Sequence, residues 1–505
     1  MKNFVSQMIH TLTRDNNSWA YFILLFLSFF FMLSLYLTPL SSNDFWIQMK
    51  VGELIRSTGN IPNNILFTFT EAKSKPFVAH EWLPSLFFSY FLTYFGYYGM
   101  ICLKFTLFFI LFLLVLKLCY RVSRDRILSF LIASLCLYTV NYRSFFRPEI
   151  VAYLCFMLQL NNILLFLDTR NMKYFVFYLL VHLIWSNSHG SFLVSVGLPV
   201  LFLLGSLLDS YFIYDNKRNF FEDKKNILIL FSLTILSFGV SIINPFGFQL
   251  LEHVYNLSQN QFLKRTIFEW FPTFSPQVKR TVIYDLFILF SCSFFCVFCF
   301  RLRKLNFSSV FLFVIFLYLA FQAQRHIAFY ALAGSYPLAL MMRDLKKKKT
   351  FRCIAYFSCC FVFVGTSFYS SSYGNTMKLK PGFYKSARIS DHALKFIKDK
   401  NITGNVLNSY SFGGQLLYHF YPRLEIFVDS RVDAYGEKYM AYYKKVFAGK
   451  YAFLRRFIKN YNINYIIINK KTMRRLKVSG NYKKLTFDGW KVIYSKKSVF
   501  ILQLF

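Results

Sequence analysis

Cysteine is missing from both ends of this chain, because all ten cysteines lie between Cys102 and Cys360. This distribution excludes a disulfide framework, and the spacings contain no zinc-binding pattern. Cys296 and Cys299 form a C-x-x-C pair. The pair lies inside a hydrophobic run, so packing is its better interpretation.

Charge is missing from long stretches of the sequence. The run from Tyr21 to Leu37 has no charged residue, similar runs recur as far as Tyr369, and 56% of the chain is hydrophobic. About 20 such residues form a helix that crosses a hydrocarbon core of roughly 30 Å. A soluble chain would instead show amphipathic helices between polar loops, so the sequence predicts a polytopic α-helical membrane protein. No small-residue cleavage site follows the first run, so we expect a retained span and no signal peptide.

Acidic residues are scarce, and the basic residues between the runs predict the orientation. The chain has 59 Lys and Arg against 23 Asp and Glu, a formal net charge of +36. Lys and Arg accumulate on cytoplasmic loops, and here they cluster at 121–126, 217–225, 301–304 and 346–349. Placing these clusters in the cytoplasm gives about eleven spans, with the N-terminus inside and the C-terminus outside. The expected spans are 20–38, 98–118, 127–142, 149–168, 173–187, 191–208, 227–243, 283–300, 308–323, 327–342 and 353–369.

One apolar segment is too short to cross the membrane. We expect residues 82–95 to form a helix on the outer surface, followed by a turn at the GYYG of 96–99. The membrane domain then covers residues 1–369, with interfacial helices in the loop 39–97.

After Tyr369 the pattern changes to short strands and helices. Residues 370–505 hold 26 Lys and Arg against 7 Asp and Glu. NVLNSY, EIFVDSR and NYIIINK have the composition of strands, and GWKVIYSKKSVFILQ that of a terminal hairpin. GGQLLYHF, EKYMAYYKKVF and FLRRFIKNY between them favour helices, so the segment is predicted to be a small α/β domain. Its charge favours anionic membrane lipids, a polyanionic glycan or a lipid phosphate as partners, and no nucleic acid is expected outside the cell.

The outward loops carry polar residues that hydrophobic spans flank on both sides. Ionisable residues at membrane depth usually mark a functional site, and because these lie on five separate loops we expect one shared cavity. The candidates are Asp44, His80 and Glu81 in the first loop, Arg147 in the second, His189 in the third, Lys264, Arg265 and Glu269 in the fourth, and Arg325 and His326 in the fifth.

The first outer loop reads NDFWIQMKVGELIRSTGNIPNNILFTFT and then PFVAHEWL. This pattern resembles the first outer loop of a large group of bacterial membrane proteins in the GT-C superfamily of glycosyltransferases. The wider superfamily includes protein O-mannosyltransferases, the lipid A aminoarabinose transferase and the catalytic subunit of oligosaccharyltransferase. Further matching segments are RPE at 147–149, WSNSHGSF at 185–192, NPFG at 244–247, FEWFP at 268–272, RHI at 325–327 and FVDSRVDAYG at 427–436.

The resemblance implies a GT-C-like fold and transfer of a sugar from a polyprenyl-phosphate donor at the outer face of a bacterial inner membrane. In the relatives an acidic residue just after the first span is catalytic, and here that residue is Asp44. The acceptor, whether glycan, lipid or protein, is left open. Relatives often carry two adjacent acids at this position, whereas this chain has Asn43-Asp44. The single carboxylate weakens the case for a divalent metal such as Mg or Mn held by paired acids.

The residues themselves suit this chemistry. Sugar transfer needs a base that takes the proton of the acceptor, and Asp44, with His80 and Glu81, supplies acid–base groups. It also needs cations that hold the leaving phosphate, for which arginine is best suited. We therefore predict substrate-binding roles for the remaining candidates, with the donor phosphate on Arg147, Arg325, Lys264 and Arg265, and with His189, Glu269 and His326 beside them.

Each first-loop candidate also has a structural interpretation. Asp44 occupies a position suited to capping the helix that follows it. His80 and Glu81 are placed to cap the interfacial helix, and His189 to end a span. The same four residues also offer the donor types of a metal site.

The later loops leave similar alternatives open. Arg147 and Glu149 straddle Pro148 and are placed to pair with each other. Glu269 precedes a tryptophan that would anchor the chain at the membrane interface. The DSRVD of 429–433 suits a turn after a strand, and acceptor recognition is its functional alternative.

Two other function classes remain. An O-antigen ligase or polymerase also uses lipid-linked glycans and outer-loop arginines, but it normally lacks an aspartate after the first span, so Asp44 disfavours it. A transporter or a non-catalytic scaffold is the other class. Transporters tend to show internal repeats, and this sequence shows none.

Overall fold

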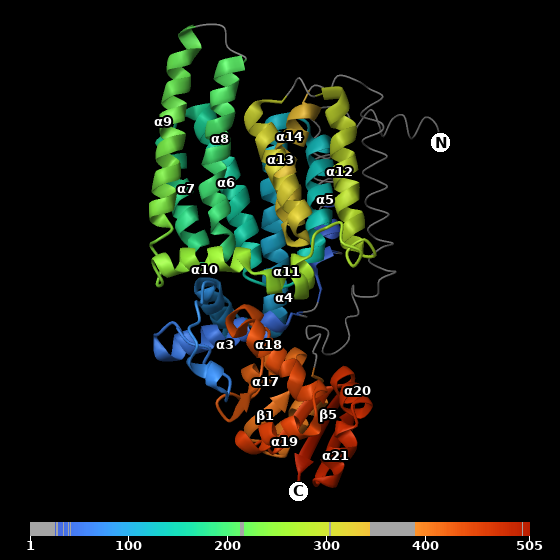
Figure 1. Ribbon diagram of the computed structural model, residues 1–505. Coiled ribbons are helices and arrows are strands. Elements are labelled where there is room, and N and C mark those ends of the chain that lie inside the picture. Colours follow the sequence, from blue (N-terminus) through green and yellow to red (C-terminus); the bar gives the residue numbers. More distant parts are fainter. Residues whose placement is uncertain are drawn as a thin grey trace, which may run out of the picture.

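The computed structural model describes residues 42–212, 217–301, 305–343, 389–496 and 498–505, together with parts of 26–40. Within these residues a bundle of long helices stands on a smaller domain that contains a β-sheet (Figure 1). The expected span 20–38 is described only in part. The expected span 353–369 and the basic cluster 346–349 lie outside the described residues.

The bundle helices agree closely with the predicted spans, because each predicted span from 98–118 to 327–342 coincides with a helix. Among the described residues, four segments are long and apolar enough to cross a membrane: Trp82–Ser123, Glu149–Thr169, Gly190–Phe212 and Val282–Cys299. The total of eleven spans stays a prediction. The helices are α4 (Trp82–Ser123), α5 (Arg126–Val140), α6 (Glu149–Thr169), α7 (Met172–Ser186), α8 (Leu193–Phe212), α9 (Lys217–Val240), α12 (Val282–Arg301), α13 (Phe307–Gln322) and α14 (Ile327–Met342).

Helix α4 is broken at Gly96, whose φ of +62° and ψ of −167° are not helical. A positive φ of this kind is a conformation that glycine adopts at little cost. The break separates an apolar helix at 82–95 from a long helix that enters the bundle, which confirms the expected turn. The placement of 82–95 on the membrane surface stays a prediction.

The C-terminal domain has the predicted mixture of strands and helices. Its sheet has the order β2-β1-β3-β5-β4, in which β1 pairs parallel with β2 and β3, and β5 pairs antiparallel with β3 and β4. The predicted terminal hairpin is β4 and β5. The strands are β1 (Gly404–Asn408), β2 (Leu424–Ile426), β3 (Tyr465–Asn469), β4 (Trp490–Lys496) and β5 (Val499–Leu504). The helices are α16 (Asp391–Asp399), α17 (Gly413–Phe420), α18 (Val432–Ala448), α19 (Tyr451–Asn460), α20 (Lys470–Val478) and α21 (Asn481–Phe487).

The first outer loop packs on the C-terminal domain as well as on the bundle. Its helix α3 (Asn43–Thr58) contacts both α4 and α17. Farther along, Thr68 forms a parallel bridge with Ile426, and its hydroxyl donates to the carbonyl of Phe427 at 3.1 Å. In Figure 1 the loop lies between the bundle and the domain, on the side where α10 (Phe248–Gln259) crosses the ends of the bundle helices. The functional site lies at this junction.

Candidate active site

One cavity of about 1370 Å³ lies between the outer loops and the C-terminal domain. All ten predicted site residues line it, which is the shared cavity that the sequence led us to expect. The C-terminal domain closes one side with Tyr410, Ser430, Arg431, Val432 and Asp433. From the sequence, Tyr410 had no assigned role, and acceptor recognition was only the alternative interpretation of the segment 429–433.

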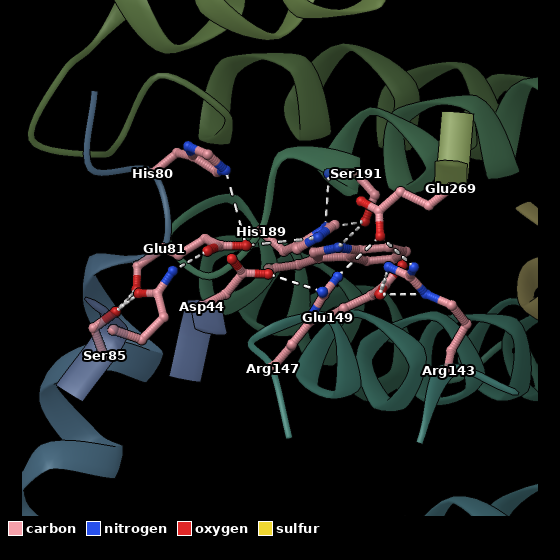
Figure 2. A network of polar contacts seen from close by, with 12 residues as sticks. Asp44, His80, Glu81, Ser85, Arg143, Arg147, Glu149, His189, Ser191 and Glu269 are labelled. Carbon is pink, nitrogen blue, oxygen red and sulfur yellow. Dashed lines mark hydrogen bonds and ion pairs between the residues drawn. The ribbon is translucent and has the colours of Figure 1, made fainter. Parts of the chain in front are cut away.

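Asp44 lies in the first turn of α3, and both of its carboxylate oxygens have partners. Oδ2 forms an ion pair with Nη2 of Arg147 at 2.9 Å, and Oδ1 accepts a hydrogen bond from the Ser430 hydroxyl at 2.6 Å. The cap interpretation of Asp44 is wrong, because the N-cap of α3 is Ser42 and no side chain caps this helix end. The carboxylate points into the cavity and away from the helix backbone (Figure 2).

Arginines and carboxylates alternate along the wall behind Asp44 (Figure 2). Arg147 contacts Glu269 through Nη1 at 3.0 Å, and Arg143 contacts the same Glu269 oxygen at 2.6 Å. Arg143 also donates through Nε to Glu149 at 2.9 Å, and both of these side chains are buried. Pairing of Arg147 with Glu149 is therefore wrong, because Arg143 takes Glu149 and leaves Arg147 to bridge Asp44 and Glu269.

Burial alone would raise the pKa of the Glu269 carboxyl and lower the pKa of the Arg147 guanidinium. In both groups the attraction of neighbouring opposite charges outweighs this effect of burial on the pKa. Arg143 and Arg147, with a contribution from Arg325, hold the pKa of Glu269 well below its usual value. Asp44 and Glu269 hold the pKa of Arg147 above its usual value. Glu269 and Arg147 are therefore both charged at neutral pH.

A second carboxyl group, Glu81, lies in the same cavity in a different electrostatic setting. Gln48, one helical turn after Asp44, donates to Glu81 Oε2 and accepts from the hydroxyl of Ser85. Gly52 lets α3 approach α4 this closely, because a Cβ at that position would lie 2.0 Å from the Ser85 carbonyl oxygen. Glu81 is the N-cap residue of α4 but its side chain makes no cap bond, so the cap interpretation is wrong.

Burial, and then the negative charge of Asp44, raises the pKa of Glu81 to about 8. Glu81 is therefore mostly protonated at neutral pH. Nε2 of His80 lies 3.9 Å and Nε2 of His189 lies 3.7 Å from its Oε1. Burial lowers the pKa of His80 to about 4 and the pKa of His189 to about 3, so both rings are neutral.

Backbone contacts fix the tautomers of these two rings. Nδ1 of His80 lies 3.2 Å from the carbonyl of Val78, which only accepts, so Nδ1 carries the proton and Nε2 turns a lone pair toward Glu81. Nδ1 of His189 accepts from the backbone N–H of Ser191 at 3.1 Å, so its Nε2 carries the proton. His189 does not end the span, because α7 ends at Ser186 with Asn187 as its C-cap. His189 is instead the N-cap of the short 3-10 helix Gly190–Phe192. The same residue also presents an N–H to Glu81.

Glu81→Gln is expected to remove a pH dependence from the stability of the protein. The pKa of Glu81, about 8 in the folded protein, is above its ordinary value of about 4.3. The stability that comes from the protonated group is fully present below about 4.3 and is lost as the pH rises through about 8. Glutamine cannot ionise, so the variant should lose less stability across this window.

The measurement is thermal unfolding in detergent at about pH 5 and about pH 9. Glu53→Gln is the control, since Glu53 is a half-exposed acid on α3 that pairs with Lys50. Equal pH dependence in Glu81→Gln and wild type would contradict the protonated state of Glu81.

Three cations in the cavity have no ion-pair partner in the part of the chain that the structure describes: Lys264, Arg265 and Arg325. Lys264 and Arg265 lie on α11 (Gln261–Thr266). Arg325 lies in the short helix after α13 and stacks on Trp270, 4.4 Å from the ring centroid. His326 beside it contacts the carbonyl of Leu319 at 3.0 Å, and burial lowers its pKa to about 4. These cations are available to an anionic ligand.

The segment 429–433 forms a turn after β2, as one interpretation of its sequence predicted. Asp429 is fully buried and pairs with Arg431 at 2.6 Å. Ser430 between them points to Asp44, and Asp433 lines the cavity.

A divalent metal at this cavity stays a prediction. In the described residues no group of three or more His, Cys, Asp or Glu is placed to hold a metal ion. The two carboxylates that converge, Asp44 and Glu269, are bridged by the guanidinium of Arg147. This donor set does not fit a divalent metal, so no step below depends on one.

No protein-family model and no curated protein sequence matches the chain. Solved structures, in contrast, do match the chain. The apo oligosaccharyltransferase of Archaeoglobus fulgidus superposes with a TM-score of 0.59 at 12% identity, over 90% of this chain and 70% of that one. The chain has the fold of the archaeal oligosaccharyltransferase AglB.

Two further AglB structures match in the same way. AglB in complex with an inhibitory peptide and a dolichol-phosphate gives a TM-score of 0.61 at 13% identity, over 96% of this chain and 74% of that one. The complex with Zn and sulfate gives a TM-score of 0.57 at 14% identity, over 94% of this chain and 72% of that one. These matches show that the chain shares the fold of AglB. Membership of the GT-C superfamily stays a prediction.

Proposed function

We propose that this chain is a membrane glycosyltransferase that moves a sugar from a polyprenyl-phosphate donor to an acceptor at the outer face of a bacterial inner membrane. The observation that carries the proposal is the arrangement of the cavity. The carboxylate of Asp44 lies in the same cavity as Lys264, Arg265 and Arg325, three cations that have no ion-pair partner among the described residues. This is the pairing of a base with an anion-binding surface that transfer from a lipid phosphate needs.

The fold supports the assignment to this class of enzyme. AglB, which has the same fold, was solved in complex with an inhibitory peptide and a dolichol-phosphate, and a dolichol-phosphate is a lipid phosphate. Because a fold alone does not fix a reaction, the residues of this cavity carry the argument. The resemblance of the first outer loop to bacterial GT-C enzymes points to the same class.

In the proposed step, Asp44 takes the proton of an acceptor hydroxyl or amide. The acceptor atom attacks the anomeric carbon of the sugar, and the bond from that carbon to the phosphate oxygen breaks. The electron pair leaves with the polyprenyl phosphate, whose growing negative charge Arg325, Lys264 and Arg265 neutralise. Arg147 orients Asp44 and adds a positive charge between the base and the phosphate.

Glu81 and His80 complete the proton-transfer set in this proposal. Glu81 carries a proton at neutral pH, and His80 turns an unprotonated nitrogen toward it. Asp44 is ion-paired with Arg147 at 2.9 Å, whereas Glu81 is protonated, so the two groups are suited to opposite base and acid roles. Asp44 is then the base, and Glu81 with His80 exchanges a proton with the reacting groups. His189, Glu269 and His326 shape the substrate site.

The orientation is also part of the proposal. The end of α8 and the start of α9 lie at the end of the bundle opposite the C-terminal domain (Figure 1). This junction carries the basic cluster 217–225, which favours the cytoplasm. The cavity and the C-terminal domain are then on the outer side, where lipid-linked donors are used.

Arg325→Ala and Arg147→Ala are each expected to weaken use of a polyprenyl-phosphate sugar by about 1.5–3 kcal/mol, or roughly 10- to 150-fold. Arg325→Ala removes a charge-assisted contact to phosphate, and Arg147→Ala removes the positive charge between the base and the phosphate. The measurement is release of free polyprenyl phosphate from purified protein supplied with a panel of polyprenyl-phosphate hexoses and solubilised cell envelope as acceptor source.

Arg280→Ala is the control, since Arg280 is an exposed cation of the same outer loop as Glu269 and does not line the cavity. Wild-type kinetics in both test variants would remove these arginines from the donor site.

A further inference from the structure

Ser430 joins the C-terminal domain to the proposed base. It lies in the turn between β2 and α18, and its hydroxyl donates to Asp44 Oδ1 at 2.6 Å across 386 positions of sequence. The other oxygen of Asp44 faces Arg147 at 2.9 Å. Each carboxylate oxygen is thus held by a different part of the protein, Oδ2 by the membrane bundle and Oδ1 by the C-terminal domain.

The turn that carries Ser430 is rigidly built. Its neighbour Arg431 donates from its backbone and its guanidinium to the fully buried Asp429. The same guanidinium donates to the carbonyl of Ile65 at 3.0 Å and lies 5.0 Å from the ring centroids of both Phe67 and Phe77. These contacts fix the turn to the first outer loop, which also carries Asp44. A hydroxyl on such a turn makes a directional hydrogen bond at little further entropic cost.

Asp44 requires a hydrogen bond of this kind to stay in one orientation, since its side chain is 35% exposed. Arg147 divides its own donors between Asp44 and Glu269, and the Ser42 hydroxyl lies 3.5 Å from Asp44 Oδ2, so both of these donors act on the same oxygen. A second donor from the opposite side fixes the plane of the carboxylate. Contacts that orient metal ligands typically contribute about 10- to 100-fold to activity, and we expect an effect of the same order for a contact that orients a base.

We infer that Ser430 is a positioning residue that holds the Asp44 carboxylate for proton abstraction, so that the C-terminal domain completes the active site. The inference rests on the proposed function, and it names the part that the domain plays in it. Other charged or titratable groups that face Asp44 are Arg147, Glu81 and Tyr410. None of them changes in a Ser430 variant.

The test compares wild type with Ser430→Ala and with Ser430→Thr, which restores the hydroxyl. The first readout needs no substrate. Dicyclohexylcarbodiimide modifies protonated carboxyl groups, so the extent of Asp44 labelling, read by mass spectrometry of its peptide across pH, follows the protonation of Asp44. Loss of a donor to the ionised carboxylate favours the protonated form, so labelling in Ser430→Ala should extend to higher pH.

The second readout is release of polyprenyl phosphate from the polyprenyl-phosphate hexose panel. Ser430→Ala should lower kcat by about 10- to 100-fold with the donor KM unchanged, and Ser430→Thr should recover both the rate and the labelling profile. Thermal unfolding checks that the variants are folded.

A Ser430→Ala protein with the wild-type labelling profile and rate would overturn the inference. Failure of the proposed function has a different signature. In that case wild type releases no polyprenyl phosphate from any donor of the panel, while the effect of Ser430→Ala on labelling is still present.

Discussion

Asp44→Asn is expected to lower sugar transfer by about 10²- to 10⁴-fold while leaving the protein folded. The amide has the size of the carboxylate, and it still accepts a hydrogen bond from Ser430, but it cannot take a proton. Arg147 keeps Glu269 as an ion-pair partner, so the variant leaves no buried charge unpaired. Binding of the donor lipid should therefore survive, and the loss should appear in kcat.

Transfer activity and thermal stability are measured side by side on the purified variant and wild type. Glu53→Gln is the matched control, because it makes the same change of acid to amide on the same helix at a side chain 41% exposed. Full activity in Asp44→Asn would remove this residue from the mechanism. If Asp44→Asn lost thermal stability together with activity, Asp44 would have a structural role instead.

Arg143→Ala is expected to destabilise the protein by about 3–5 kcal/mol, because it removes one partner of a buried ion pair and leaves the other charge uncompensated. Arg143 and Glu149 are 7% and 5% exposed, and Arg143 also holds Glu269. The measurement is the free energy of unfolding in detergent or, where unfolding is irreversible, the shift in the melting temperature.

Two comparisons isolate the ion pair from simple truncation. The double variant Arg143→Met with Glu149→Gln removes both charges and should be more stable than Arg143→Ala alone. Arg455→Ala removes an exposed partner of Asp488 and should change stability by no more than about 1 kcal/mol. If Arg143→Ala were as mild as Arg455→Ala, the pair with Glu149 would not support the cavity wall.

Much of the fold could be predicted from the sequence, because membrane helices depend on local composition. The uncharged runs predicted α5, α6, α7 and their successors closely, since a span needs only length and hydrophobicity. The break at Gly96 followed from the GYYG turn, and the α/β character of the C-terminal domain followed from alternating strand and helix patterns. The ten cavity residues were predictable for a related reason. Polar groups between two spans must lie at an end of the helix bundle, where they meet.

The pairings inside the cavity could not be predicted, because they join residues far apart in the chain. Sequence spacing suggested Arg147 with Glu149, two positions away. In the structure Arg147 pairs with Glu269 across 122 positions and with Asp44 across 103. The contribution of Ser430 was hidden for the same reason, since packing of the first outer loop on the C-terminal domain brings it to Asp44. Fixing these contacts required the tertiary structure.

The most direct test of the central claim is the pool of lipid-linked sugars in cells that lack this protein. We expect one polyprenyl-phosphate sugar to accumulate when the protein is removed, because its consumer is gone, and to return to the normal level with wild type but not with Asp44→Asn. The accumulated lipid would also identify the donor. Lipid-linked sugar pools that stay the same with wild type, with Asp44→Asn and without the protein would contradict the proposed glycosyl transfer.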